Sequence, residues 1–259
     1  MAERAQKQLG GRWLGVALVI LLLALVEAGV RAGAINAALV PPPTDVVRRI
    51  AEILISGDFI QPLGATLYLL FIAYIGASLL AIALGLLMGR FPAIYNLFEP
   101  LVELLRPLPK PALLPPLILF LGLGDLMKSV VVGLAVVFPV LINTIQGVRG
   151  VDPVLINTAR TFGYGRLAVL RKVILPAALP LIFAGLRVSL ALGLILVVIA
   201  EMLAGTGGLG YLILDMQRTF RVQNMYAWLA ILAVLGYGLN AGFLALEHRI
   251  IHWAAARPE

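Results

Sequence analysis

Few polar side chains interrupt the apolar stretches of this chain, and these limit the chemistry that it can perform. Arg187 lies inside one such stretch, and Glu201 lies near the end of the same stretch. A charge in apolar surroundings is costly unless it finds a partner. Arg187 could hold the charge of a bound anion, or it could bond to a neighbouring helix or extend toward a polar boundary. For Glu201 a structural anchor is the first interpretation.

The residue types that most enzymes need are scarce. The chain has no cysteine, and its two histidines, His248 and His252, lie together near the C-terminus. Neither a His-Glu-x-x-His nor a Gly-x-Ser-x-Gly pattern occurs, so we expect no catalytic, cofactor-binding or metal-binding residue. The run GTGGLG at 205–210 lacks the Lys-Ser/Thr pair of a phosphate loop, and it predicts a tight turn.

The composition is that of an integral membrane protein. Of the 259 residues, 61% are hydrophobic and 13% are charged, and the mean hydropathy is +1.02. These values lie far from those of a soluble domain. The formal net charge of +7 does not require a nucleic-acid partner, because basic loops on the inner side of a membrane produce the same excess.

Six apolar runs are long enough to cross a bilayer, so we expect an all-α membrane protein with six transmembrane helices. The runs are Trp13–Val30, Leu63–Met88, Pro107–Leu123, Ser129–Val148, Leu179–Leu203 and Ala227–Leu246. The first run also resembles a signal peptide, but its removal would leave five spans, and we expect it to be retained. Pro139 should kink the fourth span.

The basic residues indicate the orientation. Most of them fall on one side of the six spans, a side that includes Arg4, Arg257 and the loop 150–176. This side should be the cytoplasm, with both termini. We expect two domains. Residues 1–62 form the first helix and an external amphipathic helix that Thr44 caps and Gly57 ends, and residues 63–259 form a core of five spans.

The polar loop between the fourth and fifth spans predicts a rigid elbow of two short helices. Asp152 can cap the first helix, Pro153 suits its first position, and Gly163 can end it. A second, basic piece runs from Tyr164 to Ile174, and the chain re-enters the membrane at Pro176.

The stretch NTARTFGYGRLAVLRKVILP, residues 157–176, resembles the EAA loop of permease subunits of ATP-binding-cassette (ABC) importers. That pattern is Glu-Ala-Ala, three residues, Gly, nine residues, Ile-x-Leu-Pro. Asn157 replaces the Glu, Thr158 the first Ala and Val173 the Ile. The resemblance implies that the loop holds a coupling helix that docks on an ATPase. The docking positions it implies are Asn157, Thr158, Ala159, Arg160, Phe162, Gly163, Leu175 and Pro176.

Four further stretches resemble one branch of these permeases, which serves nitrate, sulfonate, taurine, bicarbonate and some vitamin precursors. They are LVPPPTDVVRRI, RPLPKPALLPPLILFLGLGD, INTIQGVRGVDP and VIAEMLAGTGGLGYLI. The resemblance covers residues 39–253 and implies a type I importer fold. The positions proposed for the translocation pathway are Arg187, Glu201, Thr206 and Pro139.

The resemblance implies a non-catalytic permease in a bacterial inner membrane that moves a small anion by alternating access. Its expected partners are a second permease copy in a homodimer, membrane lipid, a cytoplasmic ATPase dimer that binds ATP and Mg, and a periplasmic or lipid-anchored solute-binding protein. A vitamin precursor is an alternative substrate. An ion-coupled secondary transporter is an alternative class, although it would need intramembrane carboxylates, and only Glu27 and Glu201 lie near spans.

Overall fold

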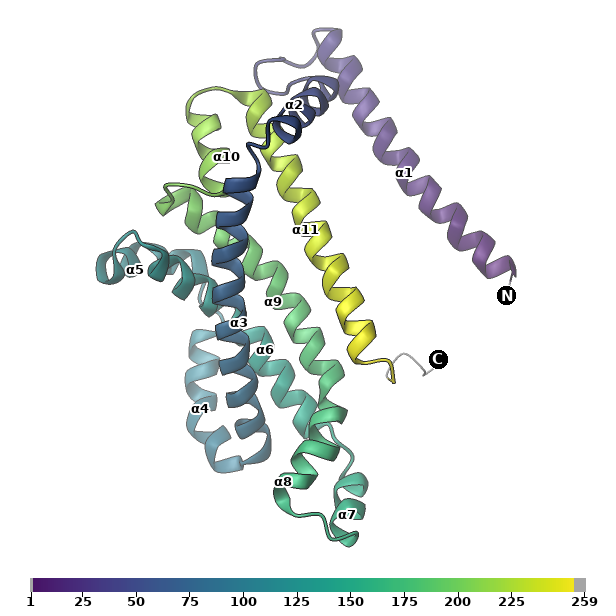
Figure 1. The fold of residues 1–259 in the computed structure, drawn as a ribbon, viewed down its shortest axis with the longest axis vertical. Helices are drawn as coiled ribbons and strands as arrows, with labels where there is room; N and C mark the ends of the chain where they lie inside the picture. The colour runs from purple at the N-terminus through teal and green to yellow at the C-terminus, as the bar shows by residue number, and fades with distance from the viewer. Residues whose placement is uncertain (1, 254–259) are drawn as a thin grey trace. The chain divides into compact units, whose positions relative to one another are not determined.

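The computed structural model describes residues 2–253, with side chains described from residue 14 onward. The described residues contain helices and no strand, which confirms the all-α class. The helices are α1 (Ala2–Arg31), α2 (Pro43–Ser56), α3 (Ile60–Arg90), α4 (Pro92–Leu105), α5 (Leu114–Leu121), α6 (Asp125–Arg149), α7 (Pro153–Thr161), α8 (Arg166–Val169), α9 (Leu175–Ala204), α10 (Leu209–Arg218) and α11 (Val222–Ile250) (Figure 1). A 3₁₀ turn, Lys110–Leu113, precedes α5, and a π-helical turn, Leu170–Ile174, precedes α9.

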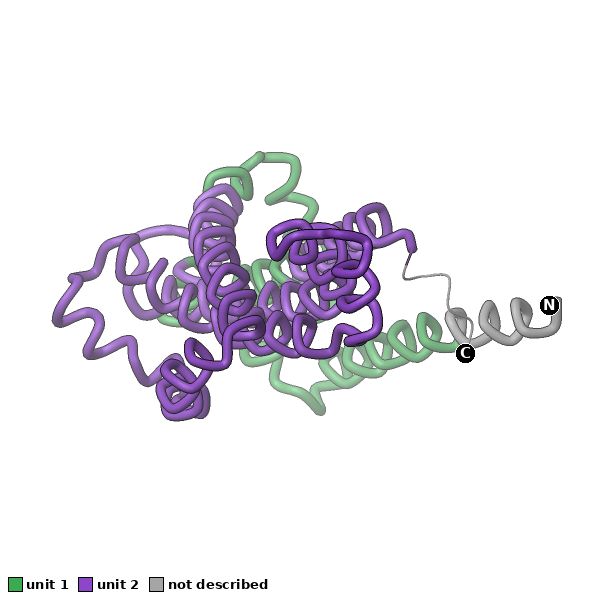
Figure 2. The backbone as a smooth tube through the Cα atoms, turned by 90° about the horizontal axis from the view of Figure 1, so that it is seen from below, with its two compact units in different colours: residues 1–61, 212–232 green, residues 62–211, 233–259 purple. Residues whose placement is uncertain are grey.

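The chain divides into two compact units (Figure 2). The first comprises residues 1–61 and 212–232, and the second comprises residues 62–211 and 233–259. The first unit thus includes the end of α10 and the start of α11, which the sequence analysis assigns to the second domain. Arg257, expected on the cytoplasmic side, lies outside the described residues.

Five helical segments are long and apolar enough to cross a membrane. They are the part of α1 from Leu14, α3, α6, the continuous segment Arg166–Ala204 and α11. Five of the six predicted spans therefore stand where the hydropathy places them. Most apolar side chains of α1 are exposed in the chain, with Leu14 at 72%, as expected of a helix surrounded by lipid.

The third predicted span, Pro107–Leu123, contains an α-helix of only 8 residues, α5, which is too short to cross a bilayer by itself. Two segments, Pro92–Leu105 and Lys110–Leu121, together pass the same length and composition test, but they are bent by 90° at a short break. If this pair is one broken span, the total is six.

The break has a cause in the sequence. Pro107 and Pro109 have no backbone N–H to continue a helix, and each disfavours the helical conformation in the residue before it. Helix α4 is absent from the sequence analysis because Glu99, Pro100 and Glu103 interrupt its apolar run and lower its hydropathy.

In the first unit, Glu27 near the end of α1 accepts hydrogen bonds from the Thr44 backbone N–H (3.1 Å) and hydroxyl (2.9 Å). Thr44 therefore joins α1 to α2, and the prediction that it caps α2 is wrong, because the helix already begins at Pro43. The predicted end is confirmed at Gly57, whose φ of +78° suits glycine.

Helices α6 and α9 form the centre of the second unit, and small residues let their backbones approach closely. A Cβ added to Gly185 of α9 would lie 2.8 Å from the Pro139 carbonyl oxygen of α6. On the α3 side, a Cβ on Gly85 would lie 2.7 Å from the Thr144 Cβ. Such small-residue contacts are typical of helix packing in membranes, where apolar side chains gain little by leaving lipid.

Candidate functional site

The first arm of the predicted elbow is helix α7, and its start follows the predicted chemistry. The Asp152 carboxylate accepts a hydrogen bond from the Val154 N–H at 2.8 Å, which caps the helix. Pro153 occupies the first helical position, where a missing N–H costs nothing.

A Schellman motif ends this helix. The Tyr164 N–H donates to the Ala159 carbonyl at 3.1 Å, and the Gly163 N–H donates to the Arg160 carbonyl at 2.9 Å. The motif requires a left-handed residue just after the helix, and Gly163 has φ of +81°. The spacing from Ala159 to Gly163 in the sequence pattern is therefore the spacing of this hydrogen-bonded turn.

The second arm continues directly into α9. Helix α8, the π-helical turn and α9 form one helical segment from Arg166 to Ala204, so Pro176 does not mark a break as the sequence analysis expects. The Leu175 N–H donates to the Leu170 carbonyl, five residues back. Pro176 lacks an N–H and crowds the preceding turn, and the wider π turn accommodates it.

The elbow presents one buried face and one exposed face. Ala159 is buried in an apolar cluster with Val169, Ile174 and Ala178, which ties the elbow to the start of α9. The opposite face exposes Phe162 at 79% and Val154 at 66% of their surface. Large apolar side chains exposed at the tip of a loop indicate a contact surface for another protein.

The predicted docking residues divide between these two faces. The exposed ones are Asn157, Thr158, Arg160, Phe162 and Gly163. Asn157, which stands where the EAA pattern has Glu, accepts a hydrogen bond from the Thr161 hydroxyl through its backbone carbonyl at 3.1 Å. Ala159 is buried, and Leu175 and Pro176 are partly buried in the helix that follows the π turn. The docking role of all eight positions stays a prediction.

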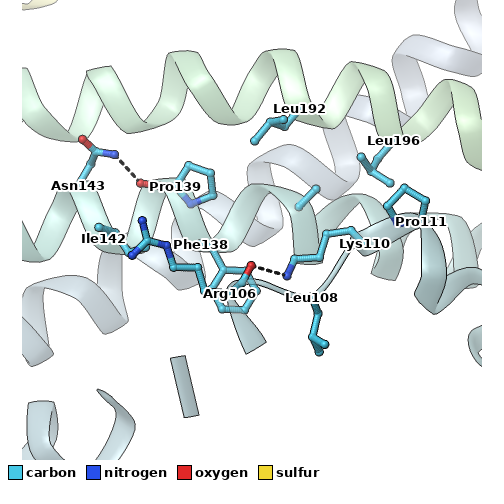
Figure 3. Close-up of a pocket in the computed structure, with 11 residues that line it drawn as sticks. Arg106, Leu108, Lys110, Pro111, Phe138, Pro139, Ile142, Asn143, Leu192 and Leu196 are labelled. Atoms are coloured by element: carbon cyan, nitrogen blue, oxygen red, sulfur yellow. Dashed lines mark hydrogen bonds between the residues drawn. The ribbon is translucent and has the colours of Figure 1, made fainter. Parts of the chain in front are cut away.

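A cavity of about 470 Å³ lies beside α6 and α9, in the second unit (Figure 3). It is lined by Arg106, Leu108, Lys110, Pro111, Ala135, Phe138, Pro139, Ile142, Asn143, Leu192 and Leu196. Of the four positions predicted for the pathway, only Pro139 lines this cavity. We refer to it below as the central cavity.

Pro139 and Asn143 are lining residues on the α6 side of the central cavity. A proline has no N–H, so the carbonyl of Ala135, four residues earlier, loses its helical donor. The Asn143 amide donates to the Pro139 carbonyl at 2.8 Å (Figure 3). That carbonyl also packs against α9, since a Cβ on Gly185 would lie 2.8 Å from it.

Two cations come from the proline-rich segment that breaks the third span. The Lys110 ammonium donates to the carbonyls of Leu105 (2.6 Å) and Arg106 (3.3 Å) at the end of α4, and lies 4.3 Å from the Phe138 ring centroid. A cation at a helix C-terminus is favourable. Among the described residues the Arg106 guanidinium has one carboxylate partner, the exposed Glu103, at 3.9 Å, and its side chain is itself 56% exposed.

Arg106 and Ile142 also line a second cavity of about 470 Å³, nearer the Arg149 end of α6. There the Arg149 guanidinium lies 3.6 Å from the Tyr95 ring centroid, and the Tyr95 hydroxyl donates to Glu99 at 2.8 Å. The two cavities adjoin at Arg106. A row of polar and cationic groups therefore follows α6 from Asn143 to its end.

Arg187 does not line either cavity. Its guanidinium bonds to the Glu247 carboxylate of α11, which is the structural bond to a neighbouring helix considered in the sequence analysis. A role of Arg187 in the pathway stays a prediction.

Glu201 is 2% exposed, and its carboxylate accepts hydrogen bonds from the Thr66 hydroxyl (2.9 Å) and the Gly210 N–H (2.9 Å). The Thr66 oxygen in turn accepts from the Leu209 N–H at 2.9 Å. This network joins α3, α9 and the glycine-rich turn, as an anchor would. Thr206 lies exposed in that turn.

Residues 77–252 match the family described as the binding-protein-dependent transport system inner membrane component. The chain belongs to this family. It is thus a multi-pass inner-membrane permease, as the EAA loop predicts.

Relatives of this permease fall in the predicted branch of ABC importers. The taurine transport system permease protein TauC of Escherichia coli is 33% identical over 224 residues, covering 85% of this chain and 82% of TauC. The aliphatic sulfonates transport permease protein SsuC of Bacillus subtilis is 30% identical over 256 residues, which cover 97% of this chain and 93% of SsuC. The nitrate import permease protein NrtB of Leptolyngbya laminosa is 31% identical over 185 residues, which cover 71% of this chain and 66% of NrtB.

The fold of the permease also matches solved structures. A chain of the inward-facing MetNI methionine ABC transporter superposes with a TM-score of 0.62 at 20% identity, covering 76% of this chain and 95% of that one. The comparison confirms the ABC importer permease fold.

Sequence reasoning missed Arg106, Lys110 and Asn143 as lining residues of the central cavity. The RPLPK segment is visible in the sequence as a non-helical lead-in, and basic residues at such a break are a usable signal. That they line one cavity with Asn143 depends on the bend between α4 and α5 and could not be read from spacing. Among the described residues no group of histidine and acidic side chains could hold a metal ion.

Proposed function

We propose that this permease works as a homodimer with its termini in the cytoplasm and imports a small anion, such as a sulfonate, taurine, nitrate or bicarbonate. A solute-binding protein would deliver the solute, and two ATPase subunits would drive alternating access. The names of the relatives support the substrate class.

The observation that carries the proposal is the elbow of α7 and α8. Its turn is closed by the Schellman motif at Gly163, its inner face is buried at Ala159, and its second arm is continuous with α9. A push on the exposed tip would therefore move α9 as a rigid body, which is what coupling to a partner ATPase requires.

The central cavity supports an anionic solute. Arg106, Lys110 and Asn143 line the central cavity together, and apolar walls complete it. Charged donors in a partly desolvated site bind oxyanions more strongly than neutral donors do. Leu192 and Leu196 would contact the apolar part of an organic anion.

The energy source would lie outside this chain. ATP and Mg would bind to the ATPase partner, and the permease itself would catalyse nothing. An ion-coupled mechanism would need a carboxylate free to bind a cation. Glu201 is instead bonded to Thr66 and Gly210, and Glu27 is bonded to Thr44.

The test changes the tip of the elbow without disturbing its fold. Phe162→Asp places a charge on a side chain that is 79% exposed, so it should leave folding unchanged. We expect the purified variant to lose its co-purifying ATPase, detected by mass spectrometry, and ATP-driven uptake in vesicles to fall to background.

Phe162→Leu is the matched control, since it keeps an apolar tip and should retain both the ATPase and uptake. If Phe162→Asp still co-purifies with an ATPase and transports at the normal rate, the elbow is not the docking element. Uptake driven by an ion gradient without ATP would overturn the proposed class.

A further inference from the structure

A separate cavity of about 500 Å³ lies between the end of α3, the start of α4 and the elbow. Three arginines line it: Arg90 from the last turn of α3, Arg160 from α7 and Arg166 from the start of α8. The sequence analysis assigns only Arg160 a role, in docking, and the transport mechanism uses neither Arg90 nor Arg166. We call this the arginine cavity.

The three charges have no acidic counterpart in the part of the chain that the structure describes. No carboxylate there forms an ion pair with Arg90, Arg160 or Arg166, whereas Arg187 and Arg49 each have one. Arg90 instead lies 5.8 Å from the Phe91 ring centroid. Like charges around one cavity repel one another, so binding an anion there would relieve the repulsion.

The remaining wall of the arginine cavity is apolar. Leu86 and Leu87 come from the membrane-spanning helix α3, and Leu167 and Leu170 come from the elbow. Leu87 is 45% and Leu167 68% exposed in this chain. A small soluble anion such as phosphate gains nothing from such a wall, whereas a molecule with a phosphate next to an acyl chain would contact both parts.

The position of the arginine cavity in the fold also favours a lipid, because it lies at the end of a membrane-spanning helix. Arg90 ends an apolar helix of 31 residues, so it lies where that helix leaves the hydrocarbon region. Basic side chains at this depth meet the phosphates of the lipid headgroups, and anionic lipids are concentrated on the inner leaflet.

We propose that the arginine cavity binds an anionic membrane phospholipid, with its phosphate held by Arg90, Arg160 and Arg166 and its acyl chain against the leucines. Since Arg90 lies on α3 while Arg160 and Arg166 lie on the elbow, the bound lipid ties the elbow to α3. The lipid would stabilise the arrangement that transmits movement to α9. This proposal goes beyond the proposed function and holds whichever solute the permease carries.

The experiment compares two double variants of the detergent-solubilised transporter. Arg90→Gln with Arg166→Gln removes two charges from the cavity. Arg171→Gln with Lys172→Gln removes two charges from the same segment of chain, at positions that do not line the cavity. Both variants are first checked for normal elution on size exclusion.

The probe is phosphatidylglycerol, titrated by native mass spectrometry. We expect the wild-type protein and the Arg171/Lys172 control to bind it equally, and the Arg90/Arg166 variant to bind roughly 30-fold more weakly, which is the effect of two interfacial basic side chains. Equal binding by all three proteins would overturn the proposal.

Two further measurements distinguish a phospholipid from a soluble phosphate as the ligand. Phosphatidylcholine with the same acyl chains should bind much more weakly, and inorganic phosphate should not compete. Leu87→Ser with Leu167→Ser should weaken the binding of phosphatidylglycerol. If inorganic phosphate competes and the leucine variant binds normally, the site takes a soluble anion and the lipid assignment is wrong.

A protein ligand is the remaining outcome. If the Arg90/Arg166 variant binds phosphatidylglycerol normally but loses its ATPase, the arginines contact the ATPase, and the lipid proposal fails while the proposed function stands. If Phe162→Asp keeps its ATPase and its uptake but lipid binding follows the arginines, the docking role of the elbow fails and the lipid site stands.

Discussion

Arg187 and Glu247 link α9 to α11 by an ion pair between residues 60 positions apart. Breaking a partly buried pair leaves an uncompensated charge, whereas replacing both partners with apolar residues removes the desolvation cost as well. The side chains are 40% and 21% exposed, so the effect lies between those of surface and buried pairs.

We therefore expect Arg187→Met to lower the free energy of unfolding by about 2 kcal/mol, and the double variant with Glu247→Leu to recover most of that loss. The midpoint of thermal unfolding in detergent measures both. A double variant as unstable as the sum of the two single variants would show that the pair contributes no coupling. If the double variant is stable but has lost uptake, Arg187 has a role in solute translocation besides its role in stability.

Arg106 is held more loosely than Arg187, because its one carboxylate partner among the described residues, Glu103, is exposed and 3.9 Å away. Arg106→Gln should raise the concentration of anion needed for half-maximal uptake about tenfold, since one charge-assisted hydrogen bond is lost. Uptake in proteoliposomes with the ATPase measures this.

Arg106→Lys keeps the charge and should retain most of the activity. Arg48→Gln, on the exposed α2, is the control for charge alone. If Arg106→Gln leaves ATP-dependent uptake unchanged, the central cavity is not part of the transport path. The family assignment would not be affected.

At the scale of elements, the glycine-rich turn between α9 and α10 shows why a motif read alone can mislead. Two of its glycines lie against the Glu201 side chain. Gly208 has φ of +94°, and a Cβ there would meet the Glu201 carboxylate, while Gly210 donates its N–H to that carboxylate. The turn is glycine-rich because it wraps around a buried acid.

Gly208→Ala should therefore lower the free energy of unfolding by about 2 kcal/mol or more, from left-handed strain and from the contact with Glu201. Gly207→Ala is the matched control, because nothing lies within 4 Å of a Cβ there. Thermal unfolding of the two variants side by side tests this. Equal stability would mean that Glu201 does not hold the turn.

At the scale of the whole molecule, the absence of cysteine allows a direct test of topology. Single cysteines at Thr158, on the elbow, and at Thr206, in the glycine-rich turn, are both at exposed positions. In intact cells we expect a membrane-impermeant maleimide to label Thr206→Cys and not Thr158→Cys.

Permeabilised cells that express the permease without its ATPase should label both positions, which provides the control for reactivity. Labelling of Thr158→Cys in intact cells would invert the proposed orientation, and it would then place the elbow away from any cytoplasmic ATPase.

Local signals predicted those elements that depend on neighbouring residues. The limits of α7 follow from Asp152, Pro153 and Gly163, and the end of α2 follows from Gly57. The error at Thr44 arises because a distant group competes, since Thr44 bonds to Glu27 of another helix instead of capping its own. In the third span the prolines mark the break locally, but the 90° angle between its two helices is set by tertiary packing.

The sequence by itself determined the membrane class, five of the spans, the elbow and the family, because hydropathy and short-range spacing depend only on residues near one another. The tertiary structure alone decided how the charges inside the apolar runs are satisfied. Arg187 and Glu201 are the charges that the sequence singles out there, yet both find partners on other helices. In the part of the chain that the structure describes, the packing of α3, α4 and the elbow places no carboxylate in an ion pair with the arginines of the arginine cavity, and Arg106 has only the exposed Glu103 at 3.9 Å.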